Sequence, residues 1–195
     1  MTHQTLFMKF KSILTALILL SLQAFSQSKN NISLVYGAVA NIVDIHGAIG
    51  DFGYTPESGT NFGLSYTHYL NKHFSLESGF LFSNNYVRLS SIQGPRGEFF
   101  YDGYVKMISV PVYAKFTFLK YVFLQGGILL DHQTNYARDG VINDESGIGI
   151  EMGIGGKYNI GRVSVFLNPF LAKHGTPGSN NLLEAGGKIG LGYDF

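Results

Sequence analysis

The clearest structural signal in the chain is its closing stretch, residues 183–195, which reads LEAGGKIGLGYDF. Apolar residues stand at every second position, and the positions between them hold glycine or a charged residue. A two-residue period over a dozen positions is typical of a β-strand whose two faces meet different surroundings, and it does not fit a helix. The stretch therefore predicts a long final strand with one apolar face and one face of small and charged residues.

The same alternation recurs along the chain. It is regular at residues 61–70, 74–82, 105–118 and 147–158. It is weaker at residues 32–43, 121–130 and 163–171. Together with the final strand, these segments predict eight strands.

The connections between these segments alternate in length. Short turns are expected at residues 71–73, 119–120 and 159–162. Long loops are expected at residues 44–59, 84–104, 131–146 and 172–180. Outer-membrane barrels have short periplasmic turns, long external loops and periplasmic termini, and aromatic residues flank the short turns here as in an aromatic girdle. The sequence thus predicts an all-β fold: an eight-stranded antiparallel up-and-down transmembrane β-barrel, integral to the cell outer membrane, with periplasmic N and C termini.

Composition indicates which face points outward. Charged residues make up 14% of the chain, against about 25% in ordinary globular domains. A soluble lipocalin-like ligand-binding barrel would turn the apolar face inward, but its outer face would then carry many Lys and Glu. The polar face here is mainly Gly and Ser, which suits a narrow interior, so we expect the apolar face to meet lipid. We expect the lumen to be plugged by six charged residues: Glu77, Lys115, Glu151, Lys157, Glu184 and Lys188.

Pro111 and Pro169 predict local bulges, because a proline cannot donate to the strand ladder.

The N-terminal residues 1–26 resemble a secretory signal peptide. Two lysines precede an apolar run, and small residues follow it at positions 24 and 26. The run is too short for a spanning helix, so a membrane anchor is the less favoured alternative. We expect cleavage after Ser26 and a barrel domain of residues 27–195, with either Met1 or Met8 as the start. The chain has no cysteine, which excludes disulfides, thiolate metal sites and a lipoprotein anchor. The net charge of +1 indicates no nucleic-acid partner.

Two features predict specific roles. Glu77 lies three residues after Phe74 and Lys115 three residues before Phe118. Because each offset is counted from a short turn, the two side chains should lie at similar height on neighbouring strands and form an interior ion pair. At the chain end, Tyr193 and Phe195 share one face and predict an assembly signal for the barrel-assembly machinery.

Residues 107–130 read MISVPVYAKFTFLKYVFLQGGILL, and the chain resembles the PorT-like outer-membrane β-barrel family of Bacteroidota. The shared features are Val110-Pro111, Lys115-Phe116 and Gly126-Gly127, and the closing GGKIGLGYDF is similar to that family's Gly-rich last strand. The resemblance implies a non-enzymatic structural or secretion-accessory role and supplies no catalytic residue. Expected partners are outer-membrane lipids, the barrel-assembly machinery and periplasmic chaperones during biogenesis, and secretion-system components. No cofactor is expected.

Other chemistry has weaker support. A barrel enzyme, such as a lipid deacylase, acyltransferase or protease at the extracellular rim, would use His174 with Ser179 and Glu184, although an ordinary solvated loop is favoured. A surface metal site would draw on scattered loop residues: His46, His132, His174, Asp44, Asp51 and Asp131. His68 is expected on the lipid-facing side near a short turn. The Gly-rich run at 147–156 lacks the following helix that a dinucleotide-binding turn needs, so we interpret it as an interior-facing strand.

Overall fold

The computed structural model describes residues 30–45, 53–54, 57–90, 100–135, 144–176 and 180–195. The predicted signal peptide, residues 1–26, lies outside the described residues. All regular structure in the described ranges is strand: β1 (Asn30–Ile45), β2 (Gly53–Tyr54), β3 (Glu57–Tyr69), β4 (Phe74–Ser90), β5 (Phe100–Phe118), β6 (Val122–Gln133), β7 (Gly147–Ile160), β8 (Val163–Thr176) and β9 (Asn180–Asp194). No helix long and apolar enough to cross a membrane occurs within them.

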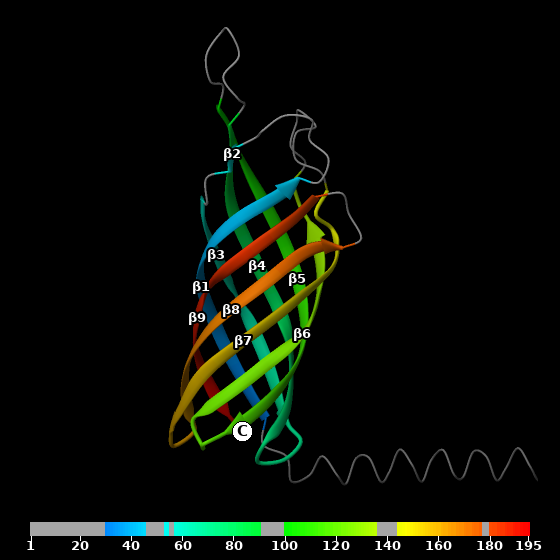
Figure 1. The fold of residues 1–195 in the computed structure, drawn as a ribbon. Coiled ribbons are helices and arrows are strands. Elements are labelled where there is room, and N and C mark those ends of the chain that lie inside the picture. Colours follow the sequence, from blue (N-terminus) through cyan, green and yellow to red (C-terminus); the bar gives the residue numbers. More distant parts are fainter. Residues whose placement is uncertain (1–29, 46–52, 55–56, 91–99, 136–143, 177–179) are drawn as a thin grey trace, which may run out of the picture.

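Eight long strands form a closed barrel. Each pairs antiparallel with the next long strand along the chain, and β9 pairs with β1 to complete the circle. Figure 1 shows the strands tilted steeply around a common axis. Tilt of this kind is required when a sheet closes on itself. The predicted eight-stranded antiparallel up-and-down barrel is confirmed, with β2 as an additional two-residue strand that the sequence did not indicate.

The two ends of the barrel differ. Three tight turns lie at one end, and the backbones of Asn30 and Phe195 exchange two hydrogen bonds of 2.8 Å there. Figure 1 places the C-terminus beside these turns. We call this the turn end, and the opposite end, where the longer connections lie, the loop end.

Strands extend further at the loop end than the sequence predicted. β4 and β5 remain paired as far as Ser90 and Phe100, and β2 adds to β4 at the tip. The expectation of a loop throughout residues 84–104 is therefore wrong. The apolar alternation ends before the strands do, because ladder hydrogen bonds join backbone groups and do not depend on the side chains. For the same reason β6 runs to Gln133 and β8 to Thr176, past the predicted loop starts.

The apolar face points outward and the polar face inward. Met152 and Leu191 are 62% and 56% exposed, whereas Glu184 and Lys188 are 3% and 4% exposed. A soluble lipocalin-like barrel would show the reverse, so the structure does not favour that alternative. The exposed apolar surface of the strands needs a lipid environment.

Interior glycines make room for aromatic rings. Phe123 and Phe166 meet edge to face in the lumen, with ring centroids 6.5 Å apart. A Cβ at Gly190 would lie 2.1 Å from Phe166, and one at Gly155 would lie 2.3 Å from Phe123. Large and small residues therefore alternate inside because a narrow barrel leaves no other way to pack its interior.

The two prolines do not create the predicted bulges. The ladder of β5 with β6 runs through Pro111, and that of β8 with β9 runs through Pro169, without a register shift. The irregularity lies elsewhere, between β7 and β8 after Ile148. A strand residue directs its N–H to only one neighbour, so a proline removes one bond and leaves the other ladder intact. Beside Pro169, the side-chain amide of Asn168 can donate to the carbonyl oxygen of Ile154 at 3.3 Å once its oxygen and nitrogen are exchanged.

The turn between β5 and β6 is strained. Leu119 and Lys120 have φ of 51° and 68°, a left-handed conformation that favours Asn and Gly. Replacing the pair by Asn-Gly should raise the free energy of unfolding by roughly 1–2 kcal/mol, since a left-handed residue with a Cβ costs about that much. Urea titration of the two proteins in lipid vesicles measures this difference. The control places the same Asn-Gly pair at residues 72–73, where φ is not positive. It should give no increase in the free energy of unfolding.

Candidate functional site

A charged layer that draws on five strands crosses the middle of the lumen. Lys188 of β9 lies 2.7 Å from both carboxylate oxygens of Glu151 of β7. Glu151 also accepts hydrogen bonds from the Tyr113 hydroxyl at 2.6 Å and from Gln125 at 3.1 Å. The Lys188 ammonium sits 4.1 Å from the ring centroid of Phe170. Each polar atom of the pair is satisfied by side chains that fill the cross-section.

A second layer lies nearer the turn end. The structure brings Glu77 and Lys115 together, with Nζ of Lys115 2.5 Å from Oε2 of Glu77. Thr67 donates to the same carboxylate oxygen at 2.8 Å. Both charged side chains are buried, and Lys115 pairs across the ladder with Ser75 rather than with Glu77, so the ion pair is diagonal. The two turns that flank β4 and β5 at this end fix the register that makes the contact possible.

A third group lies at the turn end itself. Lys157 donates to the Tyr69 hydroxyl and lies 3.6 Å from Oδ1 of Asp194. Asp194 also accepts from Asn31 at 2.8 Å and from Asn159 at 3.0 Å. The single carboxylate of this group is therefore fully engaged by its neighbours.

Toward the loop end, the structure corrects the placement of His174. The sequence favoured a solvated loop, but His174 belongs to β8 and is 2% exposed, with its ring inside the barrel. Its Nδ1 lies 2.8 Å from Oδ2 of Asp131, and its Nε2 lies 3.5 Å from Oε1 of Glu184. Asp131, also assigned to a loop, belongs to β6. Since alternation on β8 weakens beyond residue 171, the sequence carried no signal that this histidine faces inward.

The same cluster continues around the barrel wall. Asn85 donates to Glu184 at 2.6 Å and Asn61 donates to it at 3.3 Å. On the other side, the Ser109 hydroxyl donates to Asp131 at 2.5 Å. Side chains of β3, β4, β5, β6, β8 and β9 thus join in one hydrogen-bonded group that ties the strands together at this level.

This arrangement differs from the catalytic one considered for His174. A general base needs a hydroxyl nucleophile at one ring nitrogen and an orienting acid at the other. His174 has a carboxylate at each nitrogen, an arrangement that favours a charged imidazolium held between two anions. Ser109 bonds to Asp131 rather than to the ring, and Ser179 lies outside the described residues.

Of the residues considered for a surface metal site, His174 and Asp131 lie together inside the barrel rather than on its surface. His46 and Asp51 lie outside the described residues, as does the side chain of Asp44. His132 is exposed, on the opposite face of β6 from the buried Asp131. In the described ranges, no group of three His, Asp or Glu side chains is placed to hold a metal ion.

Glu145 precedes β7 and is fully buried, and its Oε2 accepts from the backbone N–H of Leu182 at 3.3 Å. Burial raises the pKa of its carboxyl group to about 7 from an ordinary 4.5, and the hydrogen bond from Leu182 opposes this only in part. An acid whose pKa is raised in the folded state binds its proton more tightly there. The contribution of this group to the free energy of unfolding is therefore fully present below pH 4.5. It is lost as the pH rises from 4.5 to 7.

Replacing Glu145 by Gln should therefore remove the loss of folding stability that the buried carboxyl group causes as the pH rises. At pH 8 the variant should be more stable than the unmodified protein by on the order of 1 kcal/mol, after allowance for solvent screening. At pH 4.5 the two should differ little. Unfolding titrations at both pH values measure the effect. Asp144→Asn is the matched control, because this exposed carboxyl has a lowered pKa, owing to hydrogen bonds from Ser146. If Asp144→Asn were stabilised at pH 8 as much as Glu145→Gln, the argument from burial would be contradicted.

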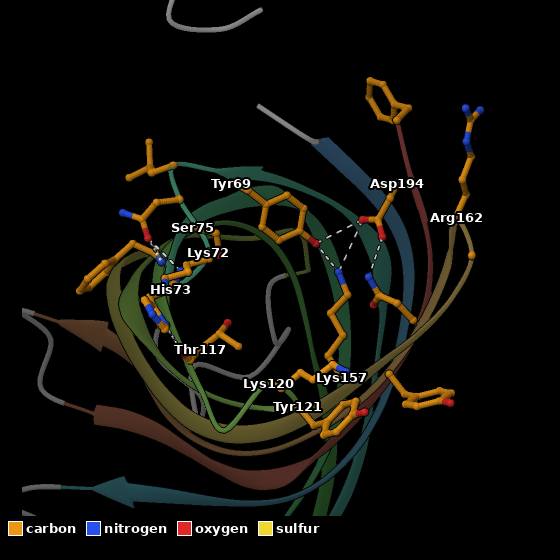
Figure 2. A pocket seen from close by; sticks show the side chains of 17 residues that line it. Tyr69, Lys72, His73, Ser75, Thr117, Lys120, Tyr121, Lys157, Arg162 and Asp194 are labelled. Carbon is orange, nitrogen blue, oxygen red and sulfur yellow. Dashed lines mark hydrogen bonds and ion pairs between the residues drawn. The ribbon is translucent and has the colours of Figure 1, made fainter. Parts of the chain in front are cut away.

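A cavity of about 1250 Å³ lies at the turn end. Figure 2 looks into it and shows Tyr69, Lys157 and Asp194 joined by hydrogen bonds and an ion pair near the wall. Its charged lining consists mainly of cations: Lys72, Lys120, Lys157 and Arg162 against the carboxylate of Asp194. The two predicted assembly-signal residues face outward nearby, with Tyr193 47% and Phe195 55% exposed. His68, expected to face lipid, is half-buried with Nδ1 2.9 Å from Oδ1 of Asn30.

A closed antiparallel barrel with an apolar outer surface and buried charged layers defines the class: the chain has the fold of the eight-stranded outer-membrane β-barrels. The outer-membrane protein OprG from Pseudomonas aeruginosa superposes with a TM-score of 0.57 at 14% identity, covering 85% of this chain and 95% of that one. The attachment invasion locus protein Ail of Yersinia pestis gives a TM-score of 0.46 at 18% identity, covering 86% and 99%. The likeness to OprG is a likeness of fold. No protein-family model and no curated protein sequence matches the chain.

Proposed function

We propose that this chain is a non-enzymatic outer-membrane barrel that acts as a structural protein or as an accessory to secretion, and that its lumen does not conduct. The observation that carries the proposal is the layer of Lys188 and Glu151. The pair is buried, bonded to Tyr113 and Gln125, and packed on Phe170. An ion crossing this level would have to break a satisfied ion pair in a space already filled with side chains.

Planar-bilayer recording tests the sealed lumen. The purified protein should insert and give no steady current. A variant with Lys188→Ala, Glu151→Ala and Phe170→Ala, combined with Glu77→Ala and Lys115→Ala, empties both interior charged layers and should give a small current. The current through this variant serves as the positive control, because it shows that the recording detects inserted barrels. Steady conductance by the unmodified protein would contradict the proposal.

The secretion-accessory role is supported by the resemblance of residues 107–130 to PorT-like barrels. If the role is correct, loss of the protein should lower the amount of specific proteins in the culture medium. Restoring the unmodified protein should restore them. Loss of membrane integrity without a change in secreted proteins would favour the structural role instead.

We further propose that the turn end faces the periplasm and that Phe195 acts as an assembly signal. Its side chain is exposed on the outer surface of the barrel, so deleting it should remove one exposed aromatic and the two backbone hydrogen bonds with Asn30 from the folded protein. Deletion should nevertheless lower membrane levels strongly, since the assembly machinery would lose its signal. Quantitative blotting of outer membranes, with Ile160→Ala as an exposed control at the same end, measures this. Normal levels of the deletion variant would refute a signalling role.

A further inference from the structure

Each tight turn at the turn end carries one strong cation and no carboxylate. Lys72 lies between β3 and β4, Lys120 between β5 and β6, and Arg162 between β7 and β8. Within the described part of the chain, none of the three lies within ion-pair distance of a carboxylate. Lys120 is 5.3 Å from the ring centroid of Tyr121, and Arg162 donates to the hydroxyl of Tyr193 at 3.2 Å. Asp194, the acidic side chain of the cavity, is already engaged by Lys157, so the turns keep a net positive charge.

The depth of these cations follows from their aromatic neighbours. Phe74, Tyr121, Tyr158 and Tyr193 are 44–58% exposed on the outer surface, within a few residues of the same turns. Aromatic belts of this kind lie at the level of lipid headgroups. Lysine and arginine near such a belt extend their apolar stems along it and place their charge in the headgroup layer. The three turn cations therefore lie where phosphate groups lie.

We propose that Lys72, Lys120 and Arg162 bind the phosphate groups of anionic phospholipids in the membrane leaflet at the turn end. The inference rests on the proposed function, which places the barrel across the membrane with this end at the periplasm. Arg162 supplies a planar guanidinium that can hold two phosphate oxygens, while the lysines act as point charges. A lipid surface of net negative charge attracts each of them.

The strained turn supports this assignment independently. Leu119 is 80% exposed and, like Lys120, adopts a left-handed conformation. In water, neither an exposed leucine side chain nor the left-handed backbone of this turn would stabilise the fold. At a membrane interface the leucine meets the acyl region and the lysine meets the headgroups. Contact with lipid thus offsets part of the backbone strain of the Leu-Lys pair.

The arrangement of the cations favours lipid over an acidic protein. Figure 2 shows Lys72 and Arg162 on opposite sides of the barrel mouth, so the charges form a rim rather than a compact patch. A protein ligand is held by contacts gathered on one face, whereas lipids surround a barrel on all sides. The rim is thus matched to an annulus of anionic headgroups.

Spin-label spectroscopy tests the proposal. The full-length mature protein is reconstituted in phosphatidylcholine bilayers with trace spin-labelled phosphatidylglycerol or phosphatidylcholine, and the association of each with the barrel is measured. The unmodified protein should prefer phosphatidylglycerol. Lys72→Gln with Lys120→Gln should lower that preference by fivefold or more, since each cation near an anionic surface is worth on the order of fivefold. Lys106→Gln with Lys173→Gln removes the same charge from the loop end and should leave it nearly unchanged.

The outcomes separate the two proposals. The unheated protein first has to show the altered gel mobility of a folded, inserted barrel, and failure to insert would contradict the proposed function. Insertion with equal association of both lipids would overturn the lipid inference alone. Equal loss in the two double variants would also overturn it. Absence of a lipid preference, with turn-dependent retention on polyglutamate, would assign the rim to an acidic protein instead.

Discussion

Replacing Lys188 by methionine is expected to lower the free energy of unfolding by about 3–5 kcal/mol, the range for breaking one side of a buried ion pair. Methionine keeps much of the side-chain volume, so the loss comes mainly from the charge. Glu151 would remain buried with hydrogen bonds from Tyr113 and Gln125 but without a counter-ion. The variant would also lose the contact of the ammonium with Phe170.

A second substitution separates charge from packing. Adding Glu151→Gln to Lys188→Met removes the unpaired carboxylate and should recover a large part of the lost stability. Urea titration of the three proteins in lipid vesicles measures this. A loss below 1 kcal/mol for Lys188→Met, or a further loss on adding Glu151→Gln, would show that the layer is not held together by its charges.

The pair of Glu77 and Lys115 is expected to show strong coupling. Each single replacement by alanine should cost about 3–5 kcal/mol, because the remaining charge is buried, and the double replacement should cost much less than the sum. Part of the Lys115 effect will be independent of Glu77, since its ammonium also lies 4.9 Å from the ring centroid of Phe123.

An exposed pair provides the control for this cycle. Arg88 and Glu57 are 3.8 Å apart near the loop end, and both are partly exposed. Coupling across such a pair is usually below about 1 kcal/mol. Additive losses for Glu77 and Lys115, or coupling no larger than for Arg88 and Glu57, would mean that interior water solvates the two charges separately.

The lipid-spanning part of the fold was predictable because two environments alternate along each strand. Residues 147–158 and 183–195 read as strands from sequence for that reason, and their outward and inward faces are as expected. The ends of β4 and β5 were not predictable, since the apolar period that marks the rest of these strands disappears there. Backbone pairing continues without it.

The interior contacts were predictable only where short turns fix the register. Glu77 and Lys115 are each three residues from a tight-turn boundary, so their relative height could be counted along the sequence. His174 and Asp131 lie at the loop end, beyond the regular alternation, and their separation of 2.8 Å depends on how far β6 and β8 extend. No local pattern carries that information.

Single-cysteine labelling tests the central claim most directly, because the natural chain has no cysteine. Lys72→Cys marks the turn end and Asp144→Cys marks the loop end. With a membrane-impermeant maleimide, we expect Asp144→Cys to react in intact cells and Lys72→Cys to react only after the outer membrane is permeabilised. Reaction of Lys72→Cys in intact cells, or recovery of both labelled proteins in the soluble periplasm, would contradict a barrel that spans the outer membrane with its turn end inside.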